Sequence, residues 1–227
     1  MTPSRLNKFI ARATGLSRRQ ADQIISEHRV KVNGQTAQIG QPVCAGDTVQ
    51  LDDGTELRLP IKRTLLLLNK PIGYVCSRRA QAENVQTIYR LLPPEYQTLK
   101  TVGRLDKDSS GLILLTDDGD LAQLLTHPRH AKQKQYQVQL DRPLSLVHQQ
   151  MINDFGLELA DGLSRLTLSQ LNPDRTCWQV TMSEGRNRQI RRTFSALGYQ
   201  TVRLHRTKFG DYDLPDDLPA GKWRQIE

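Results

Sequence analysis

The sequence has no apolar run that approaches the roughly 18–20 residues of a membrane-spanning helix. Its longest candidate, around Leu65–Leu68, has the length of a β-strand. We therefore expect no membrane contact. The N-terminal residues MTPSRLNKFIARATG are basic and lack the continuous apolar core and small-residue cleavage site of a secretory signal, which predicts a cytoplasmic location.

Cysteine is scarce and scattered. Cys44, Cys76 and Cys177 lie far apart, and none belongs to a Cys-x-x-Cys pair. This usage predicts buried free thiols in a reducing compartment and argues against both a disulfide framework and a zinc site.

The common signatures of cofactor and nucleophile chemistry are also missing. The chain has no phosphate-binding GxxxxGK[ST] loop and no glycine-rich dinucleotide fingerprint after a strand. No serine elbow or Cys–His pairing is evident. His127 and His130 lack a Cys or Glu partner at metal-ligand spacing, so we interpret THPRH as a loop. We expect neither a cofactor nor a metal.

Positive charge is abundant and unevenly distributed. The 227 residues carry 32 Lys+Arg against 24 Asp+Glu, a net charge of +8. Residues 1–31 hold seven bases against two acids, and residues 184–208 hold seven against one. Two basic clusters on one folded chain favour a long polyanion as partner, because phosphate contacts supply affinity without sequence information. Two solvated helix faces are the alternative.

Residues 1–60 are predicted to form a small domain of two helices and a short sheet. Apolar residues at Leu6, Phe9, Ile10 and Ala13 mark one face of a helix that stops at Gly15. Ser17 followed by Gln20 predicts a capping box at the start of a second helix, with Ala21, Ile24 and Ile25 as its apolar face. Asn33-Gly34 between alternating residues predicts a hairpin, and Thr48–Leu51 a further strand.

Residues 61–227 are predicted to form a larger domain, joined to the first through the Pro-containing segment Leu57–Arg63. Short turns link most strands, which predicts an α+β fold with a largely antiparallel sheet. The expected strands are Leu65–Asn69, Tyr74–Ser77, Leu112–Thr116, Gln135–Leu140, Leu166–Leu171, Cys177–Ser183 and Gln200–Leu204. The expected helices are Val85–Leu91, Gly119–Leu125, Leu144–Asp154 and Asn187–Leu197.

The strongest candidate for chemistry is the segment GRLDKDSSGLILLTDDG, Gly103–Gly119. Arg104 and Asp106 are two residues apart, so in an extended chain they point to the same face. They stand where a loop meets an apolar strand, a common position for catalytic groups. A surface ion pair at a strand end explains these residues equally well.

The helix predicted at Asn187–Leu197 carries a second set of polar residues. Ile190, Phe194 and Leu197 form its apolar stripe, whereas Arg188, Arg191 and Arg192 share another face. Arg191 flanks the stripe and is therefore expected to be half-buried.

The first domain resembles the small αL RNA-binding domain found in a small-subunit ribosomal protein and in many RNA-modifying enzymes. The matching segments are RLNKFIARATGLSRRQADQIISEHRVKVNG and PVCAGDTV. Members of that family present the two helices to structured RNA. The resemblance implies RNA contacts from Arg5, Lys8, Arg12, Arg18, Arg19 and Lys31.

The second domain resembles the bacterial ribosomal-RNA pseudouridine synthases that carry an αL domain at the N-terminus. The resemblance rests on GRLDKDSSGLILLTDDG, LLNKPIGYVCS, KQYQVQL, EGRNRQIRRTFSALGYQTVRLHRTKFG and LPAGKWRQI, in that order. It departs from the family's pattern at Ser109, where threonine is common, and at Phe209, where an aliphatic residue is usual. It implies a mainly antiparallel mixed-sheet catalytic domain.

The resemblance implies cofactor-free and metal-free conversion of uridine to pseudouridine. It assigns the catalytic carboxylate to Asp106, its arginine partner to Arg191, and the ring stacked on the uracil to Tyr136, for which ordinary core packing is the alternative. Arg104 is implied to enter the space left by an extracted nucleotide. We expect Arg186, Arg188 and Arg192 to contact RNA.

Two other functions fit the same scaffold. The first is a catalytically inactive ribosome-binding or RNA-binding factor, which the joint presence of Asp106, Tyr136 and Arg191 disfavours. The second is an N-glycoside hydrolase that releases uracil from RNA. The expected partner is ribosomal RNA or a ribosome-assembly intermediate, with the large-subunit RNA slightly favoured over the small-subunit RNA. A monomer is expected.

Overall fold

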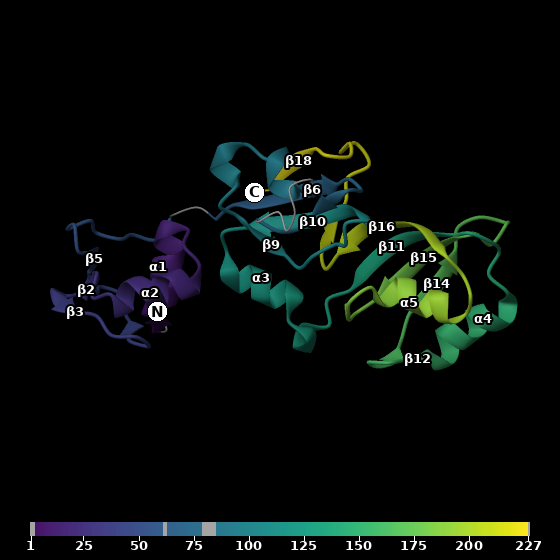
Figure 1. Cartoon of the computed structure of the whole chain (residues 1–227), viewed down its shortest axis with the longest axis horizontal. Coiled ribbons are helices and arrows are strands. Elements are labelled where there is room, and N and C mark those ends of the chain that lie inside the picture. The colour runs from purple at the N-terminus through teal and green to yellow at the C-terminus, as the bar shows by residue number, and fades with distance from the viewer. Residues whose placement is uncertain (1–2, 61–62, 79–84, 227) are drawn as a thin grey trace. The chain divides into compact units, whose positions relative to one another are not determined.

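The structure is a computed structural model that describes residues 3–60, 63–78 and 85–226 (Figure 1). The chain divides into two compact units. The first extends to Thr64 and includes Thr98–Lys100 and Asp117–Gly119; the second contains the rest. The predicted junction between residues 60 and 61 adjoins positions 61 and 62, which lie outside the described residues, and it stays a prediction.

The first unit places two helices beside short strands. Its elements are β1 (Ser4–Arg5), α1 (Leu6–Thr14), α2 (Arg18–Ser26), β2 (Val30–Val32), β3 (Gln35–Thr36), β4 (Pro42–Val43) and β5 (Val49–Leu51). The strands pair in the order β3-β2-β5, and β1 pairs with β4. Leu6, Ile10, Ala21 and Ile25 from the helices pack with Val30 and Val49 from the strands.

Local signals explain where these elements begin and end. Ser17 accepts a hydrogen bond from the backbone of Gln20, and the Gln20 side chain accepts one from the backbone of Ser17, which confirms the predicted capping box. Asn33 and Gly34 both have positive φ, as a two-residue hairpin turn requires. Gly15 ends α1 in the left-handed conformation.

The second unit is built on a large sheet. Its order along the chain is β6 (Leu65–Lys70), β7 (Tyr74–Val75), β8 (Gln86–Thr87), η1 (Ile88–Leu91), η2 (Pro94–Tyr96), β9 (Lys100–Val102), β10 (Ser110–Thr116), α3 (Gly119–Thr126), η3 (Pro128–His130), β11 (Lys134–Leu140), α4 (Leu146–Gln150), η4 (Met151–Phe155), β12 (Leu157–Leu159), β13 (Gly162–Ser164), β14 (Thr167–Gln170), β15 (Cys177–Met182), α5 (Gln189–Ala196), β16 (Thr201–Phe209), β17 (Tyr212–Asp213) and β18 (Trp223–Ile226).

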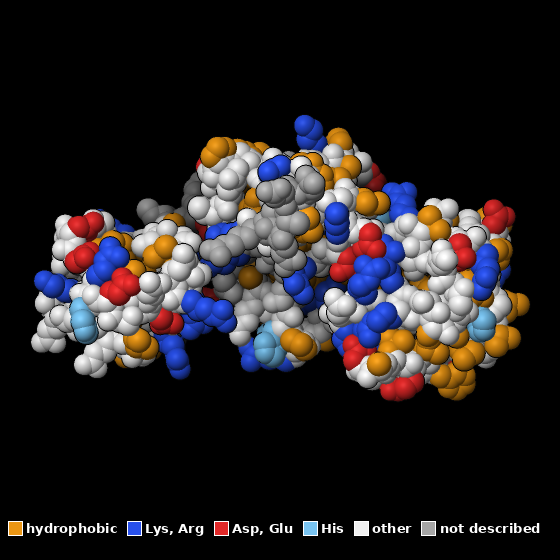
Figure 2. Space-filling model, viewed as in Figure 1, with side chains coloured by type: hydrophobic (Ala, Val, Ile, Leu, Met, Phe, Trp, Pro, Cys, Tyr) orange, Lys and Arg blue, Asp and Glu red, His pale blue; other side chains and the backbone are white. Residues whose placement is uncertain are grey.

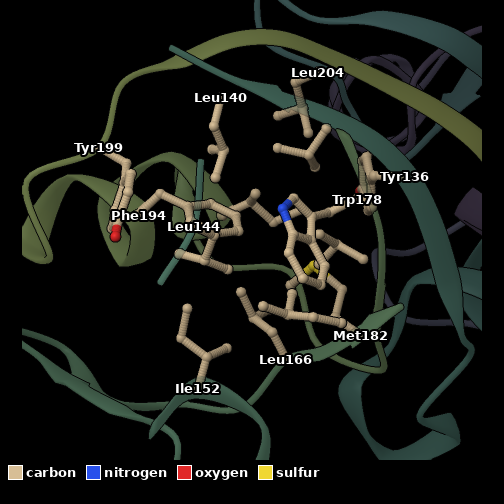
Figure 3. Packing of buried hydrophobic residues seen from close by; sticks show 14 of the residues in the cluster. Tyr136, Leu140, Leu144, Ile152, Leu166, Trp178, Met182, Phe194, Tyr199 and Leu204 are labelled. Atoms are coloured by element: carbon tan, nitrogen blue, oxygen red, sulfur yellow. The ribbon is translucent and has the colours of Figure 1, made fainter. Parts of the chain in front are cut away.

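Within the described residues, nine strands join this sheet, with the central order β14-β15-β11-β16-β10-β6-β18. Along this central order the strands pair antiparallel, except that β10 and β16 are parallel. The α+β fold with a mainly antiparallel mixed sheet is therefore confirmed. On one face of this sheet, Trp178 of β15 and Phe194 of α5 pack with residues from β11, β14 and η4 in a buried cluster that includes Tyr136 (Figure 3).

Some predicted elements were wrong. Val85–Leu91 is not an α-helix: it forms β8 and a short 3-10 helix, because Gln86–Thr87 pairs with β7. The helix expected at Leu144–Asp154 becomes one turn of α-helix followed by the π-helix η4. The β12–β13 hairpin was missed, and β16 continues to Phe209, beyond the expected end at Leu204.

The surface differs from expectation at one cysteine. Cys44 is exposed, so the prediction that all three thiols are buried was wrong for this residue, while Cys76 and Cys177 are partly buried. In the described part of the chain, no helix is both long and apolar enough to cross a bilayer. Exposed apolar side chains gather over α4 and η4 (Figure 2), namely Leu146, Val147, Met151 and Phe155.

Candidate active site

The loop Gly103–Ser109 carries the predicted catalytic carboxylate from β9 to the start of β10. It is closed by a turn in which the Ser109 amide donates to the Asp106 carbonyl oxygen at 3.1 Å. The Asp106 side chain is partly exposed, and Leu105 beside it is buried. The loop thus points one carboxylate outward while its apolar neighbour holds it to the core.

Gly111 lets this loop lie against β16. It pairs with Arg206 in the parallel ladder and has a φ of +101°. A Cβ at this position would lie 2.6 Å from the backbone nitrogen of Arg206 and closer still to its carbonyl oxygen. Only glycine therefore permits this close approach of the two strands.

We expect Gly111→Ala to lower the free energy of unfolding by about 3 kcal/mol, since both the left-handed backbone and the clash with Arg206 oppose it. Chemical denaturation with the near-ultraviolet signal would measure this loss. Gly119→Ala is the matched control, because its added Cβ meets open space and should change stability little. Equal stabilities for the two variants would contradict the assignment.

Two carboxylates and two arginines meet above this loop. Nη1 of Arg188 lies 3.0 Å from each carboxylate oxygen of Asp108 and 3.8 Å from Oδ2 of Asp106. Arg188 is the residue immediately before α5 and has a φ of +48°. Its side chain contacts the loop from the N-terminal end of that helix. Asp106 therefore has a guanidinium neighbour, supplied by Arg188.

Arg191 is more buried than Arg188 and contacts the same loop at Asp108. Its side chain is 12% exposed, as the prediction of a half-buried arginine required. Nη2 donates to the Asp108 carbonyl oxygen at 2.8 Å, Nη1 donates to the Thr201 carbonyl oxygen at 2.7 Å, and Nε lies 3.4 Å from Oδ2 of Asp108. The family resemblance implies that Arg191 pairs with Asp106, but these contacts join Arg191 to Asp108.

A cleft of about 490 Å³ lies over this cluster. Arg104, Asp106, Tyr136 and Arg188 all line it. Arg104 is exposed, whereas Tyr136 is 7% exposed and also belongs to the buried cluster of Figure 3. The ring of Tyr136 therefore packs in the core and also lines the cleft, and its predicted stacking on the uracil stays a prediction. Arg191 is not among the lining residues and supports the cleft from behind.

Comparison with known proteins identifies the family to which the chain belongs. Residues 64–196 match the family described as RNA pseudouridylate synthase, and residues 4–49 match the S4 domain. The chain belongs to the RNA pseudouridylate synthase family. The first unit is accordingly an S4 domain, and the protein is an isomerase that makes pseudouridine in RNA.

Relatives that match nearly the whole of this chain support the same assignment. The ribosomal small subunit pseudouridine synthase A of Yersinia pestis is 36% identical, over 98% of this chain and 94% of its own length. The ribosomal large subunit pseudouridine synthase B of the same organism is 34% identical, over 98% of this chain and 72% of its own length. A crystal structure of a pseudouridylate synthase, 34% identical, superposes with a TM-score of 0.69 and covers 98% of this chain and 96% of that one.

The S4 domain of this pseudouridine synthase carries the predicted basic residues on and beside its helices. Arg5, Arg18, Arg19 and Lys31 are exposed, and Lys8 and Arg12 are half-buried. Arg18 donates to the Asn7 side chain at 3.3 Å. The four exposed side chains are accessible to a phosphate backbone, and their RNA contacts stay a prediction.

Two arginines of the second basic cluster, at residues 184–208, form more intramolecular hydrogen bonds than expected. Arg186 donates to the carbonyl oxygens of Asp161, Gly162 and Leu163, so it fastens the β12–β13 turn. Arg192 donates to the Asp161 carboxylate at 2.7 Å. Both guanidinium groups have intramolecular partners, so an RNA phosphate at these sites would have to share them.

A buried polar network fixes the segment that carries Arg188. The Gln189 side chain, 2% exposed, donates to Ser164 Oγ at 3.0 Å and to the Glu184 carboxylate, and accepts from the Arg186 amide at 3.1 Å. A satisfied network of this kind rigidifies its surroundings. It fixes the start of α5, where Arg188 contacts the loop that carries Asp106.

Sequence reasoning gave no role to Lys70, which supports the loop from below. Its ammonium group is fully buried and donates to the carbonyl oxygens of Ser109 at 2.6 Å and Pro71 at 3.1 Å. Burial lowers the pKa of Lys70, while the Cys76 thiol and the carboxylates of Asp108 and Asp106 oppose this effect. Its position at the end of the mostly apolar strand β6 is the sequence feature that could have indicated a buried, functional lysine.

Proposed function

We propose that this pseudouridine synthase modifies ribosomal RNA, with Asp106 as the carboxylate that acts on the ribose. The observation that carries the proposal is the convergence of Asp106, Tyr136, Arg104 and Arg188 on one cleft. Support for a ribosomal target comes from the names of the relatives and from the S4 domain. A ribosomal target would place the protein in the cytoplasm.

The reaction breaks the bond between C1′ of the ribose and N1 of uracil, and the bonding electron pair leaves with the base. An oxocarbenium-like centre develops at C1′, which a carboxylate stabilises as nucleophile or as counter-charge. The base then turns, C5 bonds to C1′, the hydrogen on C5 leaves as a proton, and N1 takes up a proton. Nη1 of Arg188, at 3.8 Å from Oδ2 of Asp106, places a positive charge beside the carboxylate that this step needs.

The target nucleotide must leave its stack before Asp106 can reach C1′. The cleft is open to the surface at Arg104, whose exposed guanidinium suits the space vacated in the RNA. Tyr136 presents an aromatic ring inside the same cleft, where it can cover an extracted uracil.

We expect the double variant Arg18→Gln and Arg19→Gln to weaken RNA binding and flatten its salt dependence. Each lost phosphate contact should reduce the slope of log affinity against log salt by about 0.7–0.9. Binding titrations at several salt concentrations would measure the slope, with Arg58→Gln, an exposed arginine outside the two helices, as control. A slope equal to that of the wild type would show that these arginines make no phosphate contact.

Tritium release from C5-labelled ribosomal RNA tests the proposed target. The enzyme would be incubated separately with small-subunit and large-subunit RNA, and pseudouridines would be mapped in a deletion strain. The preference for large-subunit RNA stays a prediction, and release confined to the small-subunit RNA would contradict it. Release from neither RNA would overturn the ribosomal assignment, and free uracil in the tube would indicate hydrolysis.

A further inference from the structure

Three of the residues that line the cleft each have one buried polar atom without a hydrogen-bond partner in the described structure: Oγ of Ser109, Nε of Arg186 and Nη2 of Arg206. Arg186 is fastened to the β12–β13 turn through its other two nitrogens, so Ser109 and Arg206 are the candidates for a ligand. Ser109 is 1% exposed and Arg206 is 2% exposed, and both residues line the cleft. Leaving such groups unpaired is costly, so unpaired groups on residues that line a cleft indicate a ligand that pairs with them.

The sheet brings Arg206 beside Tyr136. The two residues are directly opposite in the antiparallel ladder of β11 and β16, so their side chains project from the same face. Nε of Arg206 donates to the Leu112 carbonyl oxygen at 2.8 Å, which fixes one edge of the guanidinium. The edge that carries Nη2 is left without a partner at the cleft floor.

A bulge in β16 completes this arrangement. Gln135 is opposite Lys208 and Tyr136 is opposite Arg206, so Thr207 is the extra residue. The shift brings Phe209 to the same face as Arg206, and the guanidinium lies 4.9 Å from the ring centroid. The ring therefore holds the guanidinium in place by a cation–π contact, without occupying its hydrogen-bond donors.

A second cation shares the Phe209 ring. Nζ of Lys134 lies 5.3 Å from the centroid and donates to the carbonyl oxygens of Lys132 and Glu184. Burial and the neighbouring Arg206 both lower the pKa of Lys134. The cleft floor is therefore electropositive and favours a ligand atom that carries partial or full negative charge.

We propose that Arg206 and Ser109 bind a carbonyl oxygen of the target uracil and stabilise the negative charge of the departing base. This inference rests on the proposed role of the Asp106 cleft. When N1 separates from C1′, the negative charge of the base is shared by N1 and the two carbonyl oxygens. A fixed donor aimed at such an oxygen stabilises the transition state more than the ground state.

The depth of the site favours the base over a phosphate. Each phosphate of the target nucleotide is joined to the next sugar along the RNA, so it stays at the mouth of the cleft. The base is a free end, and it alone can reach a floor where Arg206 is 2% exposed. The position of Arg206 beside Tyr136 further matches a planar ring that enters between them.

Ser109→Ala and Arg206→Gln test the proposal through single-turnover rates at saturating enzyme. We expect Ser109→Ala to slow tritium release about tenfold and to leave the thermal midpoint unchanged, because the lost hydroxyl has no partner. Arg206→Gln should slow release about 100-fold with RNA affinity preserved. Ser110→Ala and Arg203→Gln are the controls: Ser110 bonds His205, and Arg203 is exposed on the same strand.

A chemical substitution in the RNA tests the contact itself. Sulfur is a weaker acceptor than oxygen, so RNA containing 4-thiouridine or 2-thiouridine weakens a hydrogen bond at one carbonyl. We expect one of these substitutions to slow the wild-type enzyme and to have no further effect on Arg206→Gln. Digestion to nucleosides and chromatography of the isomers would measure conversion. Thio effects of equal size in both enzymes would overturn the contact.

The remaining outcomes are distinguishable. Wild-type rates in Ser109→Ala and Arg206→Gln, with Asp106→Asn inactive, would overturn this inference and leave the proposed function standing. An active Asp106→Asn would overturn the proposed function. Weaker RNA binding and a flatter salt dependence in Arg206→Gln, at an unchanged saturated rate, would indicate a phosphate contact and contradict the uracil site.

Discussion

Asp106→Asn should reduce the single-turnover rate of pseudouridine formation by at least about 1,000-fold, the scale on which loss of a catalytic nucleophile or base acts. The substitution keeps the volume of the side chain and removes its charge. Because Asp106 is partly exposed and its ion contact with Arg188 is as long as 3.8 Å, loss of its charge should disturb the fold little. Tritium release at saturating enzyme measures the effect.

RNA affinity and thermal unfolding are the controls for this variant, and both should match the wild type. Asp108→Asn provides a second comparison, because it removes one charge from the same loop. Asp108 holds Arg188 and Arg191, so we expect it to cost less turnover than Asp106→Asn. A residual rate for Asp106→Asn within tenfold of the wild type would refute the catalytic assignment.

Arg191→Lys should slow turnover although it conserves charge. We expect the loss of transition-state stabilisation to be about 2–4 kcal/mol. The guanidinium of Arg191 donates at the same time to the carbonyl oxygens of Asp108 and Thr201, and its Nε approaches the Asp108 carboxylate. A lysine cannot span these partners, and burial would favour loss of its proton. The loop would then no longer hold the Asp106 carboxylate in a fixed orientation relative to the ribose.

Arg192→Lys is the matched control on the same helix. Its guanidinium is more exposed and bonds Asp161 and the Asn187 carbonyl oxygen, away from the catalytic loop. Single-turnover tritium release at saturating enzyme would compare the two, and the control should keep its rate. Equal rates for Arg191→Lys and Arg192→Lys would assign the arginine that acts with Asp106 to Arg188, whose Nη1 lies 3.8 Å from Oδ2 of Asp106.

The sequence by itself determined the local elements and the reaction class. The capping box at Ser17 and the hairpin at Asn33-Gly34 depend on residues within a few positions of the chain. The alternation of β11 follows from the period of two in its own residues. The motif around Asp106 and the arginine-rich helix could also be recognised in the sequence, and they indicated the family that the comparisons identify. The helix expected at Val85–Leu91 failed because pairing with β7 overrides local preference there.

Only the tertiary structure decided how the site is assembled. Arg191 bonds Asp108, 83 positions away, and Arg206 bonds Leu112, 94 positions away. Such pairings depend on strand register, on the bulge at Thr207 and on the close approach that Gly111 permits, and no local pattern encodes these. The same holds for Lys70 under the catalytic loop. Burial then decides which of these charged groups lack a partner, because it removes the water that would otherwise pair with them.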